Sequence, residues 1–572
     1  MSNALESVPE ESGRLQPVRV VTAASLFDGH DAAINIMRRI LQALGAEVIH
    51  LGHDRSVEEI VDAAIQEDAH AIAVSSYQGG HIEFFTYMVE QLRARGAGDV
   101  RVYGGGGGTI TPNEIEQLHE AGVAKIFSPE DGRTLGLEGM IQGIVDDCRS
   151  ESREIALDEL STLAADAHRG VARAITLVEN LHADGAERKP ELLALRAQLA
   201  KAKGRRDVPV LGLTGTGGAG KSSVLDELLR RLRRDAPDAK IALLLVDPTR
   251  RRSGGALLGD RIRLNAVGGP NVYVRSLATR QANLALSPSV TDALLVLKAA
   301  GFDFVVVETA GIGQSDSEIV DLVDRSAYVM TPEYGAPSQL EKIDMLELAD
   351  YIVINKSDRR GALDALRDVR KQWKRNTVSF AASDDETPVF PAIAHQWNDP
   401  GVEELYAAIR RDLVASGASA FEGETRIGRA AESGGALLPN SSERYLSEIA
   451  ETVRGYREQT ETLAERAASA DAIARTLREL SEGADPLDAS ACKSLEGRRE
   501  AILAELPRDL RDALESWPQT REQYKAEEQQ YHVRDKAITV RNYGETLSGT
   551  PVAKVALPAL NDWGALTRYL RL

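Results

Sequence analysis

Cysteine is scarce in this sequence, and positive charge is in the minority. Only Cys148 and Cys492 occur among 572 residues. Two cysteines so far apart exclude a disulfide scaffold and a multi-cysteine zinc site, and they are typical of a reducing cytosol. Asp and Glu number 87 against 68 Lys and Arg, which leaves a formal net charge of −19. This charge would repel polyanions, so we expect neither nucleic acid nor an anionic membrane as a partner.

Long apolar runs are also missing. No stretch approaches the ~20 apolar residues that a helix needs to span a bilayer. Residues 1–16 are polar and acidic, without the basic and apolar parts of a secretory signal, and we expect them to be disordered. The expected location is therefore the cytoplasm.

Glycine, in contrast, is frequent, at 48 residues, which fits α/β folds with many strand-to-helix turns. Residues 17–145 alternate β-branched runs (VRVVTAA, EVIHL, AIAVSS, RVYG) with amphipathic stretches beginning at Asp31, Ser56, Glu83 and Asn113. This alternation predicts a five-stranded parallel sheet covered by helices, flavodoxin-like in size. Ligands of such sheets bind beyond the carboxyl ends of the strands, where the loops SLFDGHDAA, SSYQGGH and YGGGGGTI lie.

The rest of the chain divides into four further parts. We expect a second α/β domain with leading helices at 146–415, a flexible linker at 416–440, a helical region at 441–528, and a strand-and-turn segment at 529–572. The strand candidates of the second domain are VPVLGLTG, IALLLVD, FDFVVVETAG and YIVINK.

A phosphate-binding motif follows the first of these strands. GTGGAGKS matches GxxxxGK[ST] with a strand before it and a helix after it, the context that the motif requires. Its glycines let backbone N–H groups surround phosphate oxygens at the start of a helix. Lys221 is expected to contact the β- and γ-phosphates during catalysis, and the Ser222 hydroxyl to ligate Mg²⁺. The nucleotide-binding residues of the motif are Gly215, Gly218, Ala219, Gly220, Lys221, Ser222 and Ser223.

Two other strands end in carboxylates. IALLLVD ends at Asp247, and FDFVVVE ends at Glu308, followed by Thr309. A lone strand-end carboxylate is usually a helix cap, but two of them in a P-loop domain favour Mg²⁺ binding, direct or through water. Between these strands GGALLGDRIRL predicts a polar loop with Asp260, Arg261 and Arg263, which is either a sensor of the γ-phosphate or an ordinary capped helix start.

The strand YIVINK leads into the NKxD motif, which comprises Asn355, Lys356 and Asp358. A carboxylate has two acceptor oxygens and can pair with the N1–H and N2–H₂ donors of guanine, whereas adenine offers no such pair. A buried Asp358 would therefore discriminate against ATP. The motif predicts GTP as the nucleotide.

A histidine lies in the first sheet's binding loop. Asp28 and His30 follow the first strand in DGHDAA. An isolated loop histidine is more often solvated or a helix cap than a ligand, but a nearby carboxylate favours metal binding, because ligating imidazoles usually donate their other N–H to such a group. Cobalt suits an imidazole ligand.

DGHDAA, Ser75-Ser76-Tyr77 and Gly104-Gly105 together resemble the DxHxxG…SxL…GG signature of cobalamin-binding domains in mutases and methionine synthase. The resemblance implies that His30 is the lower cobalt ligand and Asp28 its partner. It also implies that Ser75, Gly104 and Gly105 contact the displaced nucleotide tail. Ala33 and Tyr77 depart from the usual Gly and Leu, and both departures narrow the expected tail slot.

The second domain is similar to the chaperone GTPases of methylmalonyl-CoA mutase, through ARAITLVEN, LTGTGGAGKSS, VDPTRRRSGGALLGDRIRL, ETAGIGQSDSEI and NKSD. The resemblance implies that Asp247, Asp260 and Glu308 are linked to magnesium, Asp260 and Glu308 also serving catalysis. It places GDRIRL, with Arg263 near GTP, in a nucleotide-responsive switch. The guanine-facing SA motif of these relatives is not evident near PVFPAIAH.

The order of the two domains resembles the fused isobutyryl-CoA mutase family, and LSGTPVAKVALPALNDWGALTRYL resembles the entry to an acyl-CoA mutase barrel. The resemblance implies adenosylcobalamin and Mg²⁺ as cofactors. It also implies a barrel partner in cis or in trans, a homodimer when complete, an adenosyltransferase as a further partner, and interconversion of isobutyryl-CoA and n-butyryl-CoA. We expect a truncated mutase. The alternative hypothesis is a stand-alone cobalamin carrier, in which GTP hydrolysis times the delivery of the cofactor. A third hypothesis is a small-molecule kinase, but the NKxD motif argues against ATP as its nucleotide.

Overall fold

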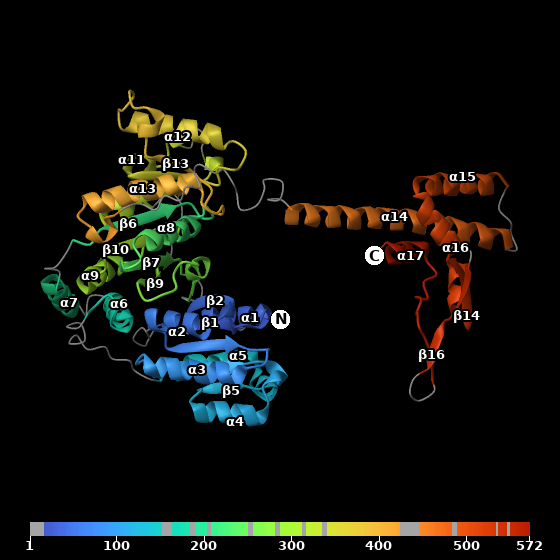
Figure 1. Cartoon of the computed structure of the whole chain (residues 1–572), viewed down its shortest axis with the longest axis horizontal. Coiled ribbons are helices and arrows are strands. Elements are labelled where there is room, and N and C mark those ends of the chain that lie inside the picture. Colours follow the sequence, from blue (N-terminus) through green and yellow to red (C-terminus); the bar gives the residue numbers. More distant parts are fainter. Residues whose placement is uncertain are drawn as a thin grey trace. The chain divides into compact units, whose positions relative to one another are not determined.

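The computed structural model shows two compact units, residues 1–434 and 435–572 (Figure 1). It describes residues 17–150, 163–183, 189–202, 207–249, 255–280, 286–311, 316–334, 340–423, 445–482, 489–533, 536–545 and 550–571. Of the helices within these ranges, none is both long and apolar enough to cross a membrane.

The N-terminal domain, residues 17–150, is a parallel α/β fold as predicted. Its elements are β1 (Arg19–Ser25), α1 (Asp31–Ala43), β2 (Glu47–Arg55), α2 (Val57–Gln66), β3 (Ala71–Ser75), α3 (His81–Ala94), β4 (Arg101–Gly105), α4 (Pro112–Ala121), β5 (Lys125–Phe127) and α5 (Pro129–Arg149). The strand order is β5-β4-β3-β1-β2. The central strands are buried on both faces, which explains their continuous β-branched runs.

A sixth strand, not predicted, extends this sheet. β8 (Ala256–Leu258) comes from the following domain and pairs in parallel with β2, Glu47 lying opposite Ala256. The sequence analysis predicts a polar loop here. In the structure the apolar residues Ala256–Leu258 instead form a strand, and the short helix η4 (Asp260–Arg263) follows it. An apolar run of three residues is too short to show the alternation of apolar and polar residues that predicts a strand.

The P-loop domain follows with a seven-stranded parallel sheet, in the order β13-β12-β11-β6-β10-β7-β9. Its strands are β6 (Val210–Gly215), β7 (Ile241–Asp247), β9 (Val272–Ala278), β10 (Phe304–Glu308), β11 (Arg325–Met330), β12 (Tyr351–Asn355) and β13 (Val389–Ala392). Its helices are α6 (His168–Ala183), α7 (Lys189–Ala202), α8 (Lys221–Asp235), α9 (Val290–Ala300), α11 (Met345–Leu348), α12 (Ala362–Asn376) and α13 (Pro400–Ala415).

Strands β9, β11 and β13 escape the sequence prediction because polar residues or proline interrupt their apolar runs. The expected linker at 416–440 also begins inside the folded core. Phe421 is buried and its ring centroid lies 5.9 Å from that of Phe304. Residues 424–440 lie outside the described residues.

A buried ionic cluster joins the two domains. Arg19 on β1 donates to Glu47 on β2 (2.7 Å) and to Glu179 on α6 (3.2 Å). From the other domain, Arg275 donates to Glu179 (2.6 Å) and Arg280 donates to Glu47 (2.9 Å). The side chains of Arg19, Glu47 and Glu179 are at most 4% exposed. Because an unpaired buried charge is strongly unfavourable, the cluster permits one relative placement of the two domains.

The titration of Glu47 reflects these contacts. Burial alone raises the pKa of Glu47, but the guanidinium groups of Arg280 and Arg19 outweigh it and hold the pKa at about 2, below the usual 4.5. The carboxylate therefore stabilises the folded state above pH 4.5, and this contribution is lost as pH falls toward 2.

In its described residues, the second unit contains three helices, two short antiparallel strand pairs and a final helix. Its elements are α14 (Tyr445–Glu482), α15 (Ala489–Glu505), α16 (Arg508–Lys525), β14 (Glu528–Val533), β15 (Lys536–Arg541), β16 (Tyr543–Glu545), β17 (Pro551–Ala553) and α17 (Trp563–Leu570). The predicted change from helix to strand falls at Glu528. Apolar side chains of α14, α15, α16 and α17 form its core.

We predict that Arg19→Met destabilises the first unit by about 3–5 kcal/mol, because it leaves three buried carboxylates, those of Glu47, Glu67 and Glu179, short of a partner. The matched control is Arg367→Met on the surface of α12, where both ion pairs are exposed and the expected change is below about 0.5 kcal/mol. Urea unfolding measures both. Equal losses in the two variants would contradict the importance of the cluster.

Candidate functional site

The loop after β1 holds a histidine ready to act as a ligand. Asp28 Oδ1 accepts from His30 Nδ1 (2.7 Å) and from the His30 backbone N–H (2.9 Å), while its Oδ2 accepts from the Tyr77 N–H (2.7 Å). The Asp28 side chain is fully buried and that of His30 is 64% exposed. An Nδ1–H held by a carboxylate leaves the Nε2 lone pair free to bind a metal.

Asp28 remains charged in this setting. Burial alone raises its pKa, but hydrogen bonds from Tyr77 N–H and from His30 outweigh burial and lower the pKa below the ordinary value. A carboxylate that stays ionised is a constant acceptor for the imidazole N–H. The predicted pair of Asp28 and His30 is therefore brought together, with a geometry suited to axial ligation.

The residues predicted to contact the nucleotide tail lie at the ends of two neighbouring strands, where Ser75 pairs with Gly105. Ser75 lies at the end of β3, and Gly104 and Gly105 lie at the end of β4. A Cβ on Gly104 would come within 2.6 Å of both Ile126 and Phe85, so no larger residue fits. The Ser75 hydroxyl is buried and, among the described residues, has no hydrogen-bond partner. A buried hydroxyl without a partner fits a site that a polar ligand completes.

Tyr77 lies between His30 and the loop after β4. Its ring centroid lies 5.4 Å from that of His30, and a Cβ on Gly107 would meet Tyr77 Cε1 at 3.2 Å. The aromatic ring is thus close to both the His30 loop and the loop after β4.

The phosphate-binding loop lies at the corresponding edge of the second sheet. Lys221 Nζ donates to the carbonyl of Gly215 (3.1 Å), so the ammonium group is folded back over the loop. Gly220 has φ +93°, and a Cβ there would meet Asn355 Nδ2 at 2.3 Å, so this position requires glycine. Ser222 is buried at the start of α8, whereas Ser223 is exposed.

Three carboxylates converge beside Ser222. The Ser222 hydroxyl donates to Glu308 Oε1 (2.8 Å), and the Asp260 backbone N–H donates to Asp247. Asp247 Oδ2 and Glu308 Oε2 are buried and have no hydrogen-bond partner in the described part of the chain. Burial, together with the negative charge of Asp260, raises the pKa of Glu308 to about 7 and that of Asp247 well above its ordinary value.

These three carboxylates favour the binding of a cation. Its positive charge would offset the repulsion among them, and it would give the two oxygens that lack hydrogen bonds a partner. Within the described ranges, however, no group of three or more His, Cys, Asp or Glu residues could hold a metal ion by itself. Mg²⁺ usually keeps several waters and uses one or two carboxylates plus substrate phosphates. The residues fit an ion that arrives with a nucleotide. Thr309 has another contact, since its hydroxyl pairs with that of Thr214 (2.9 Å).

The NKxD residues are tied to the phosphate loop. Asn355 Nδ2 donates to the Ala219 carbonyl (2.8 Å), and Lys356 Nζ donates to the Gly218 carbonyl (2.7 Å). Asn355 Oδ1 also accepts from the Ala394 N–H (3.0 Å). The loop after β13, which contains Ala394, was not predicted to take part in the site. Its sequence IAH lacks the SA motif that faces guanine in the related GTPases. Asp358, expected to be buried, is exposed because it lies beyond the buried Asn355.

The segment after β8 connects this edge to the N-terminal domain. Asp260 forms an ion pair with Arg263 (2.9 Å), whose side chain is mostly exposed. The intervening Arg261 is buried and donates to Gln66 Oε1 on α2 (2.7 Å). The sequence predicts Arg261 only as part of a charged polar loop, because its partner Gln66 lies 195 residues away. The carboxylate at the candidate ion site is thus adjacent to a residue anchored in the other domain.

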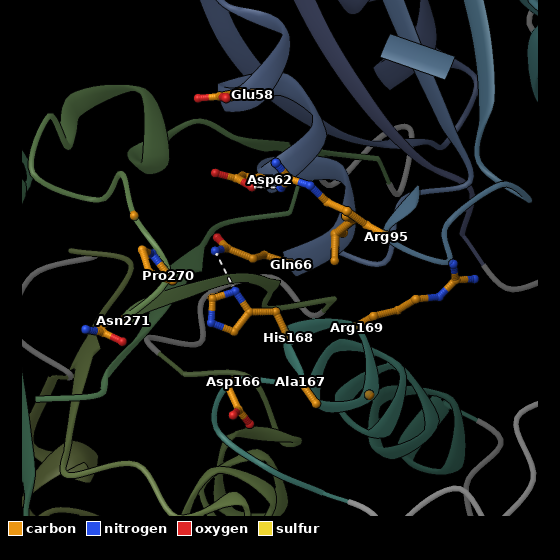
Figure 2. Close-up of a pocket in the computed structure, with 13 residues that line it drawn as sticks. Glu58, Asp62, Gln66, Arg95, Asp166, Ala167, His168, Arg169, Pro270 and Asn271 are labelled. Atoms are coloured by element: carbon orange, nitrogen blue, oxygen red, sulfur yellow. Dashed lines mark hydrogen bonds and ion pairs between the residues drawn. The ribbon is translucent and has the colours of Figure 1, made fainter. Parts of the chain in front are cut away.

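A cavity of about 700 Å³ lies at the junction of the two domains (Figure 2). Gln66 Nε2 donates to His168 Nδ1 there (3.2 Å), and burial lowers the pKa of His168. The acidic side chains Asp62 and Asp166 already pair with Arg95 and Lys240. None of the predicted site residues lines this cavity, so we assign it to the junction and not to the catalytic edge.

We predict that Glu308→Gln stabilises the nucleotide-free protein at pH 8. Glu308 keeps its proton up to about pH 7, whereas the unfolded chain releases it near 4.5, so stability falls as pH rises between these values. The difference corresponds to roughly 3 kcal/mol. Melting temperatures at pH 5 and pH 8 measure the effect, with the exposed Glu404→Gln as control. A gain of the same size at both pH values would contradict the assignment.

Comparison with known proteins supports the division into two domains. Residues 18–135 match the model of the B12 binding domain, and residues 171–436 match that of the Methylmalonyl Co-A mutase-associated GTPase MeaB. A putative GTPase of Pyrococcus horikoshii is 35% identical over 47% of this chain and 83% of its own length.

Longer relatives match almost the whole sequence. A fused isobutyryl-CoA mutase of Geobacillus kaustophilus is 49% identical over 97% of this chain and 51% of its own length. One of Cupriavidus metallidurans is 48% identical over 98% of this chain and 50% of its own length. The chain therefore spans about half the length of these relatives. Over this shared length the chain is similar to the fused isobutyryl-CoA mutases. Its second domain belongs to the MeaB family of GTPases.

Proposed function

We propose that this chain is the cobalamin-binding, GTP-hydrolysing part of an acyl-CoA mutase. The observation that carries the proposal is the Asp28–His30 pair, an imidazole exposed beyond a parallel sheet and oriented by a buried carboxylate. A P-loop domain is fixed to the same unit by the ionic cluster around Arg19.

In the first domain, His30 Nε2 is the proposed lower ligand of cobalt. Asp28 accepts the Nδ1 proton, which fixes the tautomer and makes Nε2 a stronger donor. Ser75, Gly104 and Gly105 hold the displaced nucleotide tail. When bound, adenosylcobalamin supplies a carbon radical through homolysis of its cobalt–carbon bond. The residues of this domain would bind and orient the cofactor through the exposed imidazole of His30.

In the second domain, the reaction is phosphoryl transfer from GTP to water. Lys221, which now donates to the Gly215 carbonyl, would contact the β- and γ-phosphates of GTP. The Ser222 hydroxyl, which now donates to Glu308, would help to hold Mg²⁺. Asp247, Asp260 and Glu308 would hold Mg²⁺ directly or through water, and its charge would offset the repulsion among the three carboxylates. Catalysis then rests on positioning and on neutralising charge, and Arg263 is close enough to the ion site to contribute.

Guanine recognition is assigned to Asp358, with Asn355 and Lys356 shaping the loop. The exposed Asp358 carboxylate is accessible to the N1–H and N2–H₂ donors of a base, which would cover it on binding. The Ala394 loop, bound to Asn355, closes the other side of the base pocket.

Hydrolysis is proposed to control cofactor loading or protection, through the Asp260–Arg261 segment that contacts both domains. The proposed overall reaction is the interconversion of isobutyryl-CoA and n-butyryl-CoA, with the substrate barrel in cis as in the longer relatives. Fusion in those relatives does not favour the stand-alone carrier. The homodimer, the adenosyltransferase partner and the cytoplasmic location stay predictions from sequence.

We predict that His30→Ala abolishes the absorption change that marks histidine ligation when adenosylcobalamin binds the wild type. His53→Ala is the matched control, because His53 also pairs with a neighbouring carboxylate, Asp54, at 2.9 Å and is similarly exposed. Ultraviolet–visible titration reads both variants. If His30→Ala gives the wild-type spectrum, the cobalt assignment is wrong.

We predict that Asp358→Asn weakens GTP binding at least tenfold and improves binding of xanthosine triphosphate. The amide exchanges one acceptor for a donor, which suits the C2 carbonyl of xanthine. Isothermal titration with both nucleotides measures the change, and Asp364→Asn on the exposed start of α12 is the control. Unchanged preference for GTP would exclude Asp358 as the base-reading residue.

A further inference from the structure

One face of α14 carries an apolar stripe that is covered along half of its length. The stripe follows a spacing of four and three residues, as in helix–helix seams, and comprises Ile449, Val453, Tyr456, Thr460, Leu463, Ala467 and Ala470. Its second half, from Leu463 onward, belongs to the core shared with α15, α16 and α17. In its first half Ile449 and Val453 are each 44% exposed and Tyr456 is 47% exposed.

The helix that covers the second half runs antiparallel along α14. Asp562, at the start of α17, faces Arg475 (3.7 Å), and Arg568 forms an ion pair with Glu461 (2.8 Å). The last contact is made by Arg571, whose guanidinium lies 4.8 Å from the ring centroid of Tyr456. The end of α17 therefore points along the stripe toward its bare half (Figure 1).

The bare half is an apolar seam and not scattered surface exposure. Ile449, Val453 and Tyr456 continue the register of the buried residues Leu463 and Ala467 without a break. The same side-chain row is thus core in one part of the helix and surface in the next. A partner over this row would stabilise the first turns of α14.

We propose that the bare seam of α14, defined by Ile449, Val453 and Tyr456, docks the substrate-binding part of the mutase. This inference rests on the proposed function for the identity of the occupant. The relatives carry about as much chain again as the part matched here. α17 brings the polypeptide to Tyr456, so a covalently joined partner meets the seam at high effective concentration.

The size of the seam favours a tethered partner over a second copy. Stable association of separate proteins buries ~800 Å² on each side. Three side chains that are each less than half exposed offer much less than this area. A tethered domain does not pay the full entropy of association, so a small apolar contact is enough to fix its position.

Thiol reactivity tests the proposal. In a background with Cys492→Ser, Val453→Cys places a thiol on the seam, and Glu451→Cys places one on the opposite face of the helix. Cys148 is buried and serves as the blank. Each variant is compared in the 572-residue chain and in a chimeric chain extended with the part of the Geobacillus kaustophilus relative that this chain does not match. A thiol-specific chromogenic reagent reports the rates.

We expect the thiol at position 453 to react at least tenfold more slowly in the extended chain, while the thiol at position 451 reacts at the same rate in both. Equal rates at position 453 would overturn the proposal. Protection in the short chain that grows with concentration would assign the seam to a second copy. Protection there at every concentration would assign it to the first unit. Both outcomes overturn the proposal without affecting the His30 and Asp358 tests, which concern the first unit alone.

Discussion

The ion pairs of Arg19 with Glu47 and Glu179 determine how the first 423 residues are organised. Each of these charges is buried, and a buried charge is tolerated only when its partners are in place. Arg275 and Arg280 supply those partners from the P-loop domain. The two α/β domains therefore have one docked arrangement instead of a range of hinge positions. On this fixed frame, a segment of one domain can enter the sheet of the other.

The two candidate sites differ in how they hold charge. Around His30, hydrogen bonds to Asp28 keep a carboxylate ionised and an imidazole oriented, so the site is prepared before any ligand arrives. Around Ser222, burial and mutual repulsion leave Glu308 and Asp247 reluctant to ionise. The first arrangement suits a resident cofactor. The second suits an ion that comes and goes with a nucleotide, because its binding and loss change the protonation of the carboxylates.

Much of the fold could be predicted from sequence, because parallel strands buried on both faces give continuous apolar runs. The sites could be located because the motifs GTGGAGKS, NKSD and DGHDAA lie at the ends of such strands. The local pairing of Asp28 with His30 also follows from their spacing. What could not be predicted depends on residues far apart in the chain. Arg261 meets Gln66, and β8 meets β2, only after both domains have folded. Asp358 is exposed because accessibility depends on the surrounding loops, which no motif describes.

The strand that the P-loop domain contributes to the first sheet has a further consequence. The outer edge of β2 is paired by Ala256–Leu258, so each domain completes a surface of the other. A fragment ending at residue 150 would leave the backbone N–H and C=O groups of that edge open to strands of other molecules, which is the usual origin of edge-to-edge aggregation. The boundary that looks natural in the sequence is thus a poor place to divide the protein.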